Sequence, residues 1–583
     1  MMRKTKIICT LGPACDNEKT IRSLLKTGMD VARFNFSHGD YEEHTRRQKL
    51  IRKLSKEEGL YIPCILDTKG PEIRTGTFKD GSVTLKEGQI FTLTTDEIDG
   101  DDSRVTISFK GLPEDVHEGD KILVDDGLIA MSVIKTTASE ITCKVINGGV
   151  LGDRKGINVP GVTVSLPYMS EKDRNDIVFG VENGFEFIAA SFTRNAQDLL
   201  DIRKVLEDLG GGNIGIIAKI ENMEGVKNID AILRLSRGIM VARGDMGVEI
   251  PLEDVPIIQK RLINKAYRAG KIVITATQML DSMIYNPRPT RAETTDVANA
   301  IYDGTSAIML SGETAAGKYP VEAVETMARI ALRAENDINY ERKMEQEELP
   351  ECTDVTNAIS HAACTTAYDL GAAAIIAVTK TGMSVRNVSK YRPSIPIIGC
   401  SPDNMTLRQL NMSWGVTPLA MQEESETDKL FSAAVENSKA KGLLENGDLA
   451  VITAGVPLGV AGTTNMLKVH IVGDVLVKGN GINDMCAQAN LCVAATEEDA
   501  RNNFQDGDIL VIHKTSNNIL DLMKRSSGIV TEEEGDESHA AIAGIALDKP
   551  VIVGAVGATQ ILKSGTMVKL DGEKGLVCII KGI

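Results

Sequence analysis

The chain has 583 residues and a formal net charge of −16, and 42% of its residues are hydrophobic. This length exceeds what one hydrophobic core usually serves, so several domains are expected. The acidic balance argues against nucleic acid and anionic membranes as partners. No secretory leader and no apolar run long enough to span a membrane are found, so the sequence predicts a cytoplasmic protein. The ten cysteines form no CxxC pair, which argues against a zinc ribbon or a disulfide framework.

An alternation of apolar strands, polar strand-end loops and helices begins at the N-terminus and is typical of a parallel sheet. Residues 70–165 interrupt it, and it then resumes. Eight strands are predicted, at residues 4–9, 29–35, 61–66, 187–190, 214–220, 238–242, 271–276 and 307–310. The two outer segments, 1–69 and 166–334, together approach the roughly 250 residues typical of a (β/α)8 barrel.

The other segments predict three further domains. Residues 70–165 are rich in Val, Ile, Thr and Gly and contain hairpin-like Asp-Gly turns, which indicates an inserted β-rich lid domain. Residues 335–473 alternate helical and strand patterns and predict a separate α/β domain. Residues 478–583 predict an extra small α/β domain. The expected fold class is α/β: a TIM barrel with an inserted β-rich lid, an α/β C-terminal domain and a small swivelling-type domain.

Charged residues stand at the ends of two neighbouring strands of the predicted barrel. Strand side chains alternate between faces, so Lys219 and Glu221 point the same way, and Asp245 follows the next strand. A single charge in an apolar run is usually a strand end that reaches solvent. Three together, at the strand ends where barrels place catalytic groups, instead indicate a cation beside a hard-metal site, as phosphoryl chemistry requires. Other predicted strand ends carry polar residues: Asn35, Ser37, Asp67, Thr277, Ser311 and Glu313.

Nine motifs in order give residues 1–473 a specific resemblance to pyruvate kinases. They are KIICTLGPA (6–14), ARFNFSHG (32–39), LDTKGPEIR (66–74), KGINVPG (155–161), IIAKIENMEG (216–225), VARGDMGVEIP (241–251), ATQMLDSM (276–283), NPRPTRAETTDVANAI (286–301) and LSGETAAGKYP (310–320). Residues 478–583 resemble the extension of the long bacterial form, which is similar to the mobile phosphohistidine domain of phosphoenolpyruvate-utilising enzymes.

The resemblance implies transfer of the phosphoryl group of phosphoenolpyruvate to ADP, which gives ATP and an enolate that is protonated to pyruvate in the last step of glycolysis. Glu221 and Asp245 resemble the ligands of Mg2+ or Mn2+. Lys219 and Arg33 resemble the cations that contact the transferring phosphoryl group. Backbone N–H groups near Gly244 resemble the binding site of the substrate carboxylate.

The resemblance also assigns proton transfer to residues after two other strands. Thr277 resembles the residue that helps protonate the enolate through water, and Ser311 and Glu313 are placed in the same relay. Standing alone, Thr277 is also compatible with an ordinary strand-end threonine.

A potassium site and a nucleotide site follow from the same resemblance. Four residues resemble an all-oxygen K+ site: Asn35, Ser37, Asp67 and Thr68. Glu72 stands where potassium-dependent members have Glu, so K+ dependence is expected. Arg74 and Lys155 match contacts to nucleotide phosphates and flank the lid, which is expected to close and exclude water. Taken without the family, Asn35 and Ser37 are equally compatible with capping a helix.

A third site is predicted in the α/β domain, where a strand passes through a loop into a helix. The loop contains Thr379, Lys380, Thr381, Gly382 and Ser384. Hydroxyls, backbone N–H groups and a helix N-terminus suit a phosphate. The resemblance implies a phosphorylated effector, and Met383 replaces an Arg often found there, so AMP or ribose 5-phosphate is favoured over fructose bisphosphate. A plain capped turn is the alternative, and a homotetramer is implied by the family alone.

His539 in the last segment raises a second possible function. Related phosphohistidine domains have TSHA where this chain has ESHA, with Asp536 and Glu537 nearby. Like charge disfavours a phosphorylated imidazole, so a structural or assembly role is the default prediction. The alternative functions are a phosphohistidine-type phosphotransferase similar to phosphoenolpyruvate synthase, and a catalytically silent sensor of nucleotides or sugar phosphates.

Overall fold

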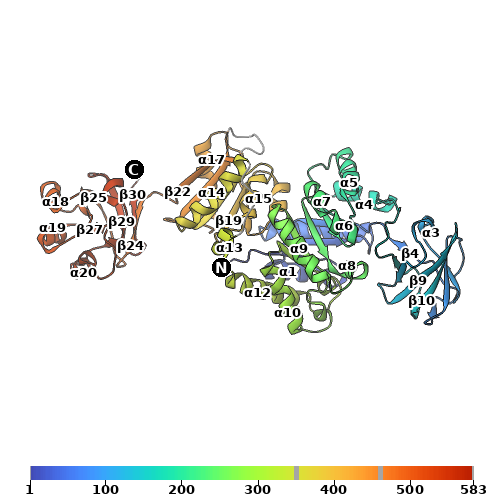
Figure 1. Ribbon diagram of the computed structural model, residues 1–583. Helices are drawn as coiled ribbons and strands as arrows, with labels where there is room; N and C mark the ends of the chain where they lie inside the picture. Colours follow the sequence, from blue (N-terminus) through green and yellow to red (C-terminus); the bar gives the residue numbers. More distant parts are fainter. Residues whose placement is uncertain (1, 347–353, 457–463, 581–583) are drawn as a thin grey trace. The chain divides into compact units, whose positions relative to one another are not determined.

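The computed structural model describes residues 2–346, 354–456 and 464–580 (Figure 1). By its contacts the chain divides into two compact units. The first comprises Met1–Cys364, Ala377–Glu423 and Ala454–Met466, and the second comprises Thr365–Ile376, Glu424–Thr453 and Leu467–Ile583. Among the described residues, no helix is long and apolar enough to cross a membrane.

Eight parallel strands close into a barrel in the first unit, as predicted. They are β1 (Lys6–Thr10), β2 (Val31–Asn35), β3 (Cys64–Asp67), β13 (Phe187–Ala190), β14 (Gly215–Ile220), β15 (Gly238–Ala242), β16 (Ile272–Ala276) and β17 (Ala307–Leu310). Their order around the barrel is β1-β17-β16-β15-β14-β13-β3-β2. The strands are almost entirely buried, which explains why they read as continuous apolar runs rather than alternating ones.

Helices follow the barrel strands, and several of them begin at a residue whose side chain caps the helix. They are α1 (Glu18–Thr27), α2 (Tyr41–Glu57), α4 (Glu171–Glu182), α5 (Ala196–Asp208), α6 (Met223–Lys227), α7 (Ile229–Leu235), α8 (Arg243–Glu249), α9 (Val255–Arg268), α10 (Arg291–Tyr302), α11 (Gly312–Ala315), α12 (Pro320–Asp337) and α13 (Tyr340–Gln346). The Asn17 side chain accepts from the Thr20 N–H at the start of α1, and Gly28 ends that helix with φ of 131°.

The inserted segment is β-rich, as predicted, and has its own hydrophobic core. Its strands are β4 (Ile73–Arg74), β5 (Ser82–Leu85), β6 (Ile90–Thr94), β7 (Arg104–Thr106), β8 (Lys121–Val124), β9 (Ile129–Thr136), β10 (Glu140–Asn147), β11 (Gly149–Gly152) and β12 (Gly156–Asn158), with one short helix, α3 (Leu112–Asp115). Seven form one sheet, and β5 pairs with β11. Gly81 and Gly127 sit in turns with φ of 76° and 82°, which explains the Asp-Gly pairs.

The next segment alternates helices and strands. Its elements are α14 (Val355–Asp369), β18 (Ala374–Val378), α15 (Met383–Lys390), β19 (Ile397–Ser401), α16 (Asn404–Leu410), β20 (Val416–Ala420), α17 (Thr427–Ala440), β21 (Leu449–Gly455) and β22 (Thr464–Ile471). Strand β20 was not predicted, and it contains Pro418, which has no N–H to donate. It pairs with β19 and lies at the sheet edge, where a missing N–H is tolerated. The predicted boundary at 335–351 partly overlaps α12 and α13, and its residues 347–351 lie outside the described residues.

The C-terminal part of the second unit is a small α/β domain, as predicted. Its strands are β23 (Val475–Lys478), β24 (Asn480–Gly481), β25 (Cys486–Ala494), β26 (Ile509–Ile512), β27 (Gly528–Thr531), β28 (Val551–Val553), β29 (Met567–Asp571) and β30 (Leu576–Ile579). Its helices are α18 (Glu497–Asn503), α19 (Leu520–Arg525), α20 (His539–Ala546) and α21 (Ala558–Ile561). Strands β25 to β28 pair in parallel, whereas β29 and β30 are antiparallel.

Glu186, just before β13, ties three parts of the first unit together. Its carboxylate accepts the Cys64 N–H at 2.7 Å and pairs with Arg52 at 2.8 Å and with Arg408. Glu186 is fully buried, so each of these contacts replaces water that the carboxylate has lost.

We therefore expect Glu186→Gln to lower the free energy of unfolding of the first unit by roughly 3 kcal/mol, because it leaves two arginines without their shared anion. Urea unfolding followed by the fluorescence of Trp414 measures this. Glu207→Gln, on the exposed face of α5, is the control. Equal midpoints for the two variants would contradict the prediction.

Candidate active site

Lys219 is the centre of a buried cluster at the carboxyl ends of the barrel strands. Its Nζ lies 3.1 Å from Asp67 Oδ1 and 3.0 Å from Glu221 Oε1, and it donates to Ser191 Oγ at 2.7 Å. Lys219 and Glu221 therefore share one face of β14, as the sequence predicted. Burial lowers the pKa of Lys219, but the Asp67 and Glu221 carboxylates outweigh it, so the ammonium stays charged.

Arg33 is a second cation on the same carboxylate. Its Nε donates to Asp67 Oδ2 at 2.6 Å and its Nη1 donates to Thr10 Oγ1 at 2.9 Å. Burial raises the pKa of Asp67, but the charges of Arg33 and Lys219 together hold it below its usual value. Asp67 thus fixes two cations at neighbouring strand ends.

Glu221 has one carboxylate oxygen that the protein leaves without a hydrogen bond. Its Oε2 accepts the Phe192 N–H at 2.5 Å, whereas Oε1 is buried without a hydrogen-bond partner. The Lys219 ammonium approaches Oε1 as an ion pair without the direction of a hydrogen bond. Burial, with the nearby Asp245 charge, raises the pKa of Glu221 to about 8, against the opposing effect of Lys219. A buried carboxylate in this state is stabilised by a further cation.

The donor set around Glu221 fits Mg2+ or Mn2+. Asp245 lies in the first turn of α8, directly after β15, the strand that pairs with β14. Among the described residues, no group of three or more His, Cys, Asp or Glu side chains could hold a metal. Two carboxylates leave several positions for water and substrate oxygens, which is how Mg2+ is usually bound at phosphate-transfer sites.

Thr277 occupies a constrained turn after β16. Thr277 has φ of 67°, a left-handed value that is rare for a β-branched residue. Gln278 follows with φ of 53°. Arg243 donates to the Thr277 carbonyl at 2.7 Å and pairs with Asp296 at 2.7 Å, which holds the turn in place. The Thr277 hydroxyl accepts the Gly244 N–H at 2.8 Å. The Gly244 N–H, which the sequence analysis assigned to the substrate carboxylate, therefore donates to the Thr277 hydroxyl in this structure.

The residues predicted to bind potassium lie on and after β2 and β3. Asn35 is opposite Asp67 in the strand register. The Asn35 side chain accepts the Ser37 N–H at 3.1 Å, and the Thr68 hydroxyl accepts the Ser191 N–H at 3.2 Å. The helix-cap alternative for Asn35 and Ser37 is wrong, because Asp40 caps α2.

Two residues after β13 were missed by the sequence analysis. Ser191 accepts from Lys219 and donates to the Thr68 carbonyl at 2.6 Å, so it joins the cation to the strand beside it. Phe192 has φ of 52°, and its N–H is the partner of Glu221. The signal available was position alone, because both residues directly follow the carboxyl end of β13, as catalytic groups in such barrels do.

A cleft of about 580 Å³ lies beside this cluster, between the barrel and the lid. Asp245, Arg74 and Lys155 all line it. Arg74 pairs with Glu72 at 2.7 Å, and Lys155 pairs with Asp125 at 2.9 Å. The two cations predicted to bind nucleotide thus face the same cleft as the metal-ligand candidate, each held by a carboxylate.

Three family profiles match successive segments of the chain. The family profile "Pyruvate kinase, barrel domain" matches residues 2–324, and "Pyruvate kinase, alpha/beta domain" matches residues 357–470. The profile "PEP-utilising enzyme, mobile domain" matches residues 504–575. The chain belongs to the pyruvate kinase family.

Its relatives in the pyruvate kinase family match from end to end. A pyruvate kinase of Geobacillus stearothermophilus is 49% identical over 579 residues, covering 99% of each chain. One of Bacillus licheniformis is 49% identical over 578 residues, again covering 99% of each chain. The crystal structure of a pyruvate kinase from Cryptosporidium parvum superimposes with a TM-score of 0.77 at 42% identity, covering 81% of this chain and 96% of that one. This pyruvate kinase is accordingly a phosphotransferase.

The predicted effector loop lies before α15. The Thr379 hydroxyl accepts the N–H of Gly382, whose φ is 80°, at 2.9 Å. Lys380 pairs with Glu423 at 2.9 Å, Arg386 donates to the Thr381 carbonyl at 3.0 Å, and the Ser384 hydroxyl contacts Thr464 at 2.5 Å. The loop therefore combines a left-handed glycine with several hydroxyls at a helix start. This geometry is compatible with both the phosphate site and the capped turn.

His539 begins α20, and both of its ring nitrogens already have partners. Nδ1 lies 2.9 Å from the Thr515 hydroxyl and Nε2 lies 3.1 Å from Asn517 Oδ1. These contacts favour the structural role over phosphoryl transfer, because a phosphorylated nitrogen has to give up its hydrogen bond.

Glu313, which was predicted to join the proton relay, is held by backbone N–H groups. It is buried, and its two carboxylate oxygens accept the N–H groups of Leu280 at 3.0 Å and Ser311 at 2.7 Å. Burial raises its pKa, and these N–H groups oppose the rise. Glu313 joins the segment after Thr277 to the end of β17.

We expect Glu313→Gln to lower the free energy of unfolding by about 1–3 kcal/mol, because an amide cannot accept both N–H groups with the same strength. Urea unfolding and steady-state kinetics on the same samples measure this, with Glu322→Gln on the exposed face of α12 as control. A large loss of kcat at unchanged stability would instead assign Glu313 to the relay.

Proposed function

We propose that the chain transfers the phosphoryl group of phosphoenolpyruvate to ADP at the Lys219 cluster. The observation that carries this proposal is the buried Lys219 ammonium, held between Asp67 and Glu221 and next to Asp245, which lines the cleft. Phosphoryl transfer depends chiefly on positioning and on charges fixed before the reaction, and a cation held in this way supplies both.

Glu221 and Asp245 are proposed to hold the divalent ion. The buried Oε1 of Glu221, which has an ion pair with Lys219 but no hydrogen bond, supports this assignment. When bound, Mg2+ or Mn2+ supplies positive charge to the oxygens of the transferring phosphoryl group. Lys219 and Arg33 then contact the same group from the side of Asp67, and their ion pairs keep both side chains in place before substrate arrives.

Protonation of the enolate is assigned to Thr277, acting through water. Its hydroxyl is fixed by the Gly244 N–H and by the carbonyl of Ala276 at 2.6 Å. The Gly244 N–H is the proposed donor to the substrate carboxylate, so substrate binding exchanges this contact and frees the hydroxyl for water. Ser311 and Glu313 complete the surrounding turn as positioning residues.

ADP is proposed to bind in the cleft with its phosphates against Arg74 and Lys155. Their contacts with Glu72 and Asp125 are exchanged for phosphate oxygens when the lid closes over the nucleotide. A closed cleft excludes the water that would otherwise compete with ADP for the phosphoryl group.

Lys219→Met tests the proposal directly. We expect kcat for pyruvate formation to fall by about 10²–10³-fold, since a charge-stabilising group is removed from the transition state. The lactate-dehydrogenase-coupled assay with Mg2+ and K+ measures it, with Lys49→Met on the exposed face of α2 as control. If the two variants turn over equally, Lys219 has no catalytic role.

A potassium requirement is the second test. Asn35, Ser37, Asp67 and Thr68 supply oxygen atoms near the cations, and K+ is proposed to bind there. Replacing K+ by tetramethylammonium at equal ionic strength is expected to abolish most of the activity.

Glu72→Lys is expected to restore part of that activity, because its ammonium supplies the missing positive charge beside the site. Glu224→Lys, which reverses another charge lining the cleft, is the control. Undiminished wild-type activity without K+ would contradict the requirement.

Regulation and assembly extend the proposal. A phosphorylated effector, AMP or ribose 5-phosphate in preference to fructose bisphosphate, is assigned to Thr379, Lys380, Thr381, Gly382 and Ser384. The hydroxyls and the left-handed Gly382 support this assignment. A homotetramer and a cytoplasmic location are proposed on the basis of the family relationship.

A further inference from the structure

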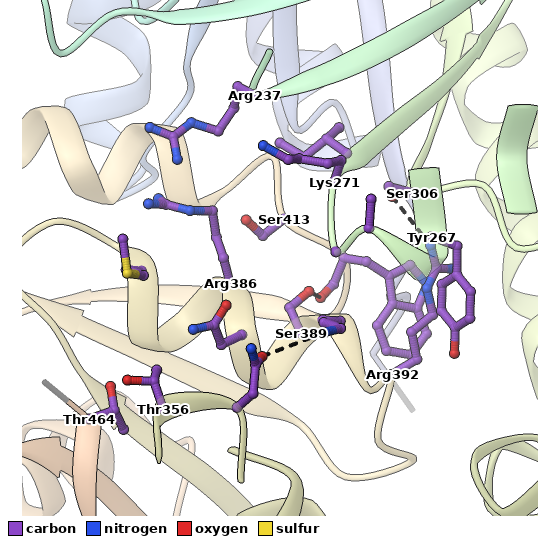
Figure 2. Close-up of a pocket in the computed structure, with 18 of the residues that line it drawn as sticks. Arg237, Tyr267, Lys271, Ser306, Thr356, Arg386, Ser389, Arg392, Ser413 and Thr464 are labelled. Atoms are coloured by element: carbon purple, nitrogen blue, oxygen red, sulfur yellow. Dashed lines mark hydrogen bonds between the residues drawn. The ribbon is translucent and has the colours of Figure 1, made fainter. Parts of the chain in front are cut away.

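A second cavity lies at the opposite end of the barrel from the active site. It has a volume of about 760 Å³, and its walls come from the amino ends of β15 and β16 and from helix α15 (Figure 2). Such a volume is in the range that holds a small metabolite rather than a single ion. Five basic residues line this cavity: Arg237, Lys271, Arg386, Lys390 and Arg392.

Three of these cations come together from different elements. Arg237 directly precedes β15, Lys271 directly precedes β16, and Arg386 belongs to α15. Figure 2 shows the three side chains extending into the same region of the cavity. Lys271 donates to the Ser236 carbonyl at 2.8 Å.

None of these three has a carboxylate partner in the described part of the chain. Arg386 has the carbonyl of Thr381 as its acceptor, and the Arg237 guanidinium makes no hydrogen bond to the described residues. The acid in the cavity wall is Asp354. Its carboxylate accepts the N–H of Asn357 at 2.9 Å and so caps α14.

Burial and the excess of positive charge in this cluster lower the pKa values of Arg386 and Lys271. Burial lowers the pKa of Arg386, and the charge of Arg237 lowers it further. Burial likewise lowers the pKa of Lys271, with Arg237 and Arg386 adding to the effect. Like charges that have lost water repel one another, and a bound anion removes this cost.

Arg392, in the same wall, is an arginine whose guanidinium is held by contacts within the protein. It donates to the carbonyls of Gly304 and Thr305 at 2.6 and 3.1 Å and lies over the rings of Tyr267 and Trp414. Its guanidinium therefore joins the barrel to the packed aromatic residues. The contrast separates Arg237, Lys271 and Arg386 from cations that the fold itself requires.

A neutral group in the cavity also lacks a partner. The Ser413 hydroxyl is buried and makes no hydrogen bond to the described residues. Buried hydroxyls are normally satisfied by protein, water or ligand. Ser413, with the Asn387 and Asn357 side chains in the same wall, suits the hydroxyl groups of a sugar.

We propose that this cavity binds a small phosphorylated metabolite, with its phosphate held by Arg237, Lys271 and Arg386. The site is separate from the active site, and its three cations lie outside the loop Thr379–Ser384, although Met383 of that loop lines the same cavity and Arg386 donates to the Thr381 carbonyl. It does not depend on the function proposed for either. Charge-assisted contacts to a phosphate dianion supply the affinity, and the polar wall contacts the rest of the molecule.

Trp414 makes this proposal measurable without turnover. It lines the cavity and is the single tryptophan of the chain. The full-length protein, without substrates, is titrated with ribose 5-phosphate, with inorganic phosphate, and with ribose as the uncharged control. Tryptophan fluorescence and calorimetry are followed together. The two phosphates are expected to change the fluorescence saturably, and ribose is not.

Arg237→Gln and Lys271→Gln are each expected to raise the Kd for ribose 5-phosphate by about tenfold, the loss of one charge-assisted hydrogen bond. Lys271→Arg, which keeps the charge, is expected to retain most of the affinity. Lys204→Gln, exposed on α5, is the surface control, and Lys380→Gln removes the charge of the effector loop. Thermal unfolding checks that each variant is folded.

The outcomes separate this site from the loop. Unchanged binding in Arg237→Gln and Lys271→Gln overturns the proposal, as does loss of the fluorescence response in Lys380→Gln alone. Absence of any response to both phosphates at millimolar concentration also overturns it. A response lost in the two cavity variants and kept in Lys380→Gln supports it.

Discussion

The ion pairs of Lys219 are the interaction on which the active site depends. A buried ammonium is unstable alone, and so are the buried Asp67 and Glu221 carboxylates. The ammonium is tolerated because both carboxylates lie within about 3 Å of it, and each carboxylate is tolerated because the ammonium is near. Removing one leaves an uncompensated charge, so the charges that we propose assist phosphoryl transfer also hold one another in position.

Barrel closure brings these groups together. Strand side chains alternate, which puts Lys219 and Glu221 on one face, and the parallel register sets Asn35 beside Asp67. No local segment could do this, because two partners of Lys219, Asp67 on β3 and Ser191 after β13, lie far from it in sequence. The fold therefore brings the side chains at the strand ends together, and the residue types at those positions supply the charged and polar groups.

Much of the barrel and part of the candidate site could be predicted from the sequence. The eight barrel strands were predictable because both faces of a parallel sheet are covered and leave long apolar runs. Lys219, Glu221 and Asp245 were recognisable because charges are costly in such runs. The left-handed turn at Thr277 was not, since it is held by Arg243, which follows the neighbouring strand β15, rather than by residues next to it in sequence. The role of Ser191 was not either, because a serine after a strand has no distinctive pattern.

The two ends of the barrel treat charge in opposite ways. At the carboxyl ends, cations and carboxylates nearly balance, and the excess is one oxygen of Glu221 that accepts no hydrogen bond. At the amino ends of β15 and β16, Arg237 and Lys271 face Arg386 without a carboxylate from the described residues. Neither charge imbalance stabilises the fold, because a buried charged group that lacks a hydrogen bond or a partner of opposite sign is destabilising. We propose a partner of opposite sign for each, a divalent cation at the carboxyl ends and a phosphate at the amino ends.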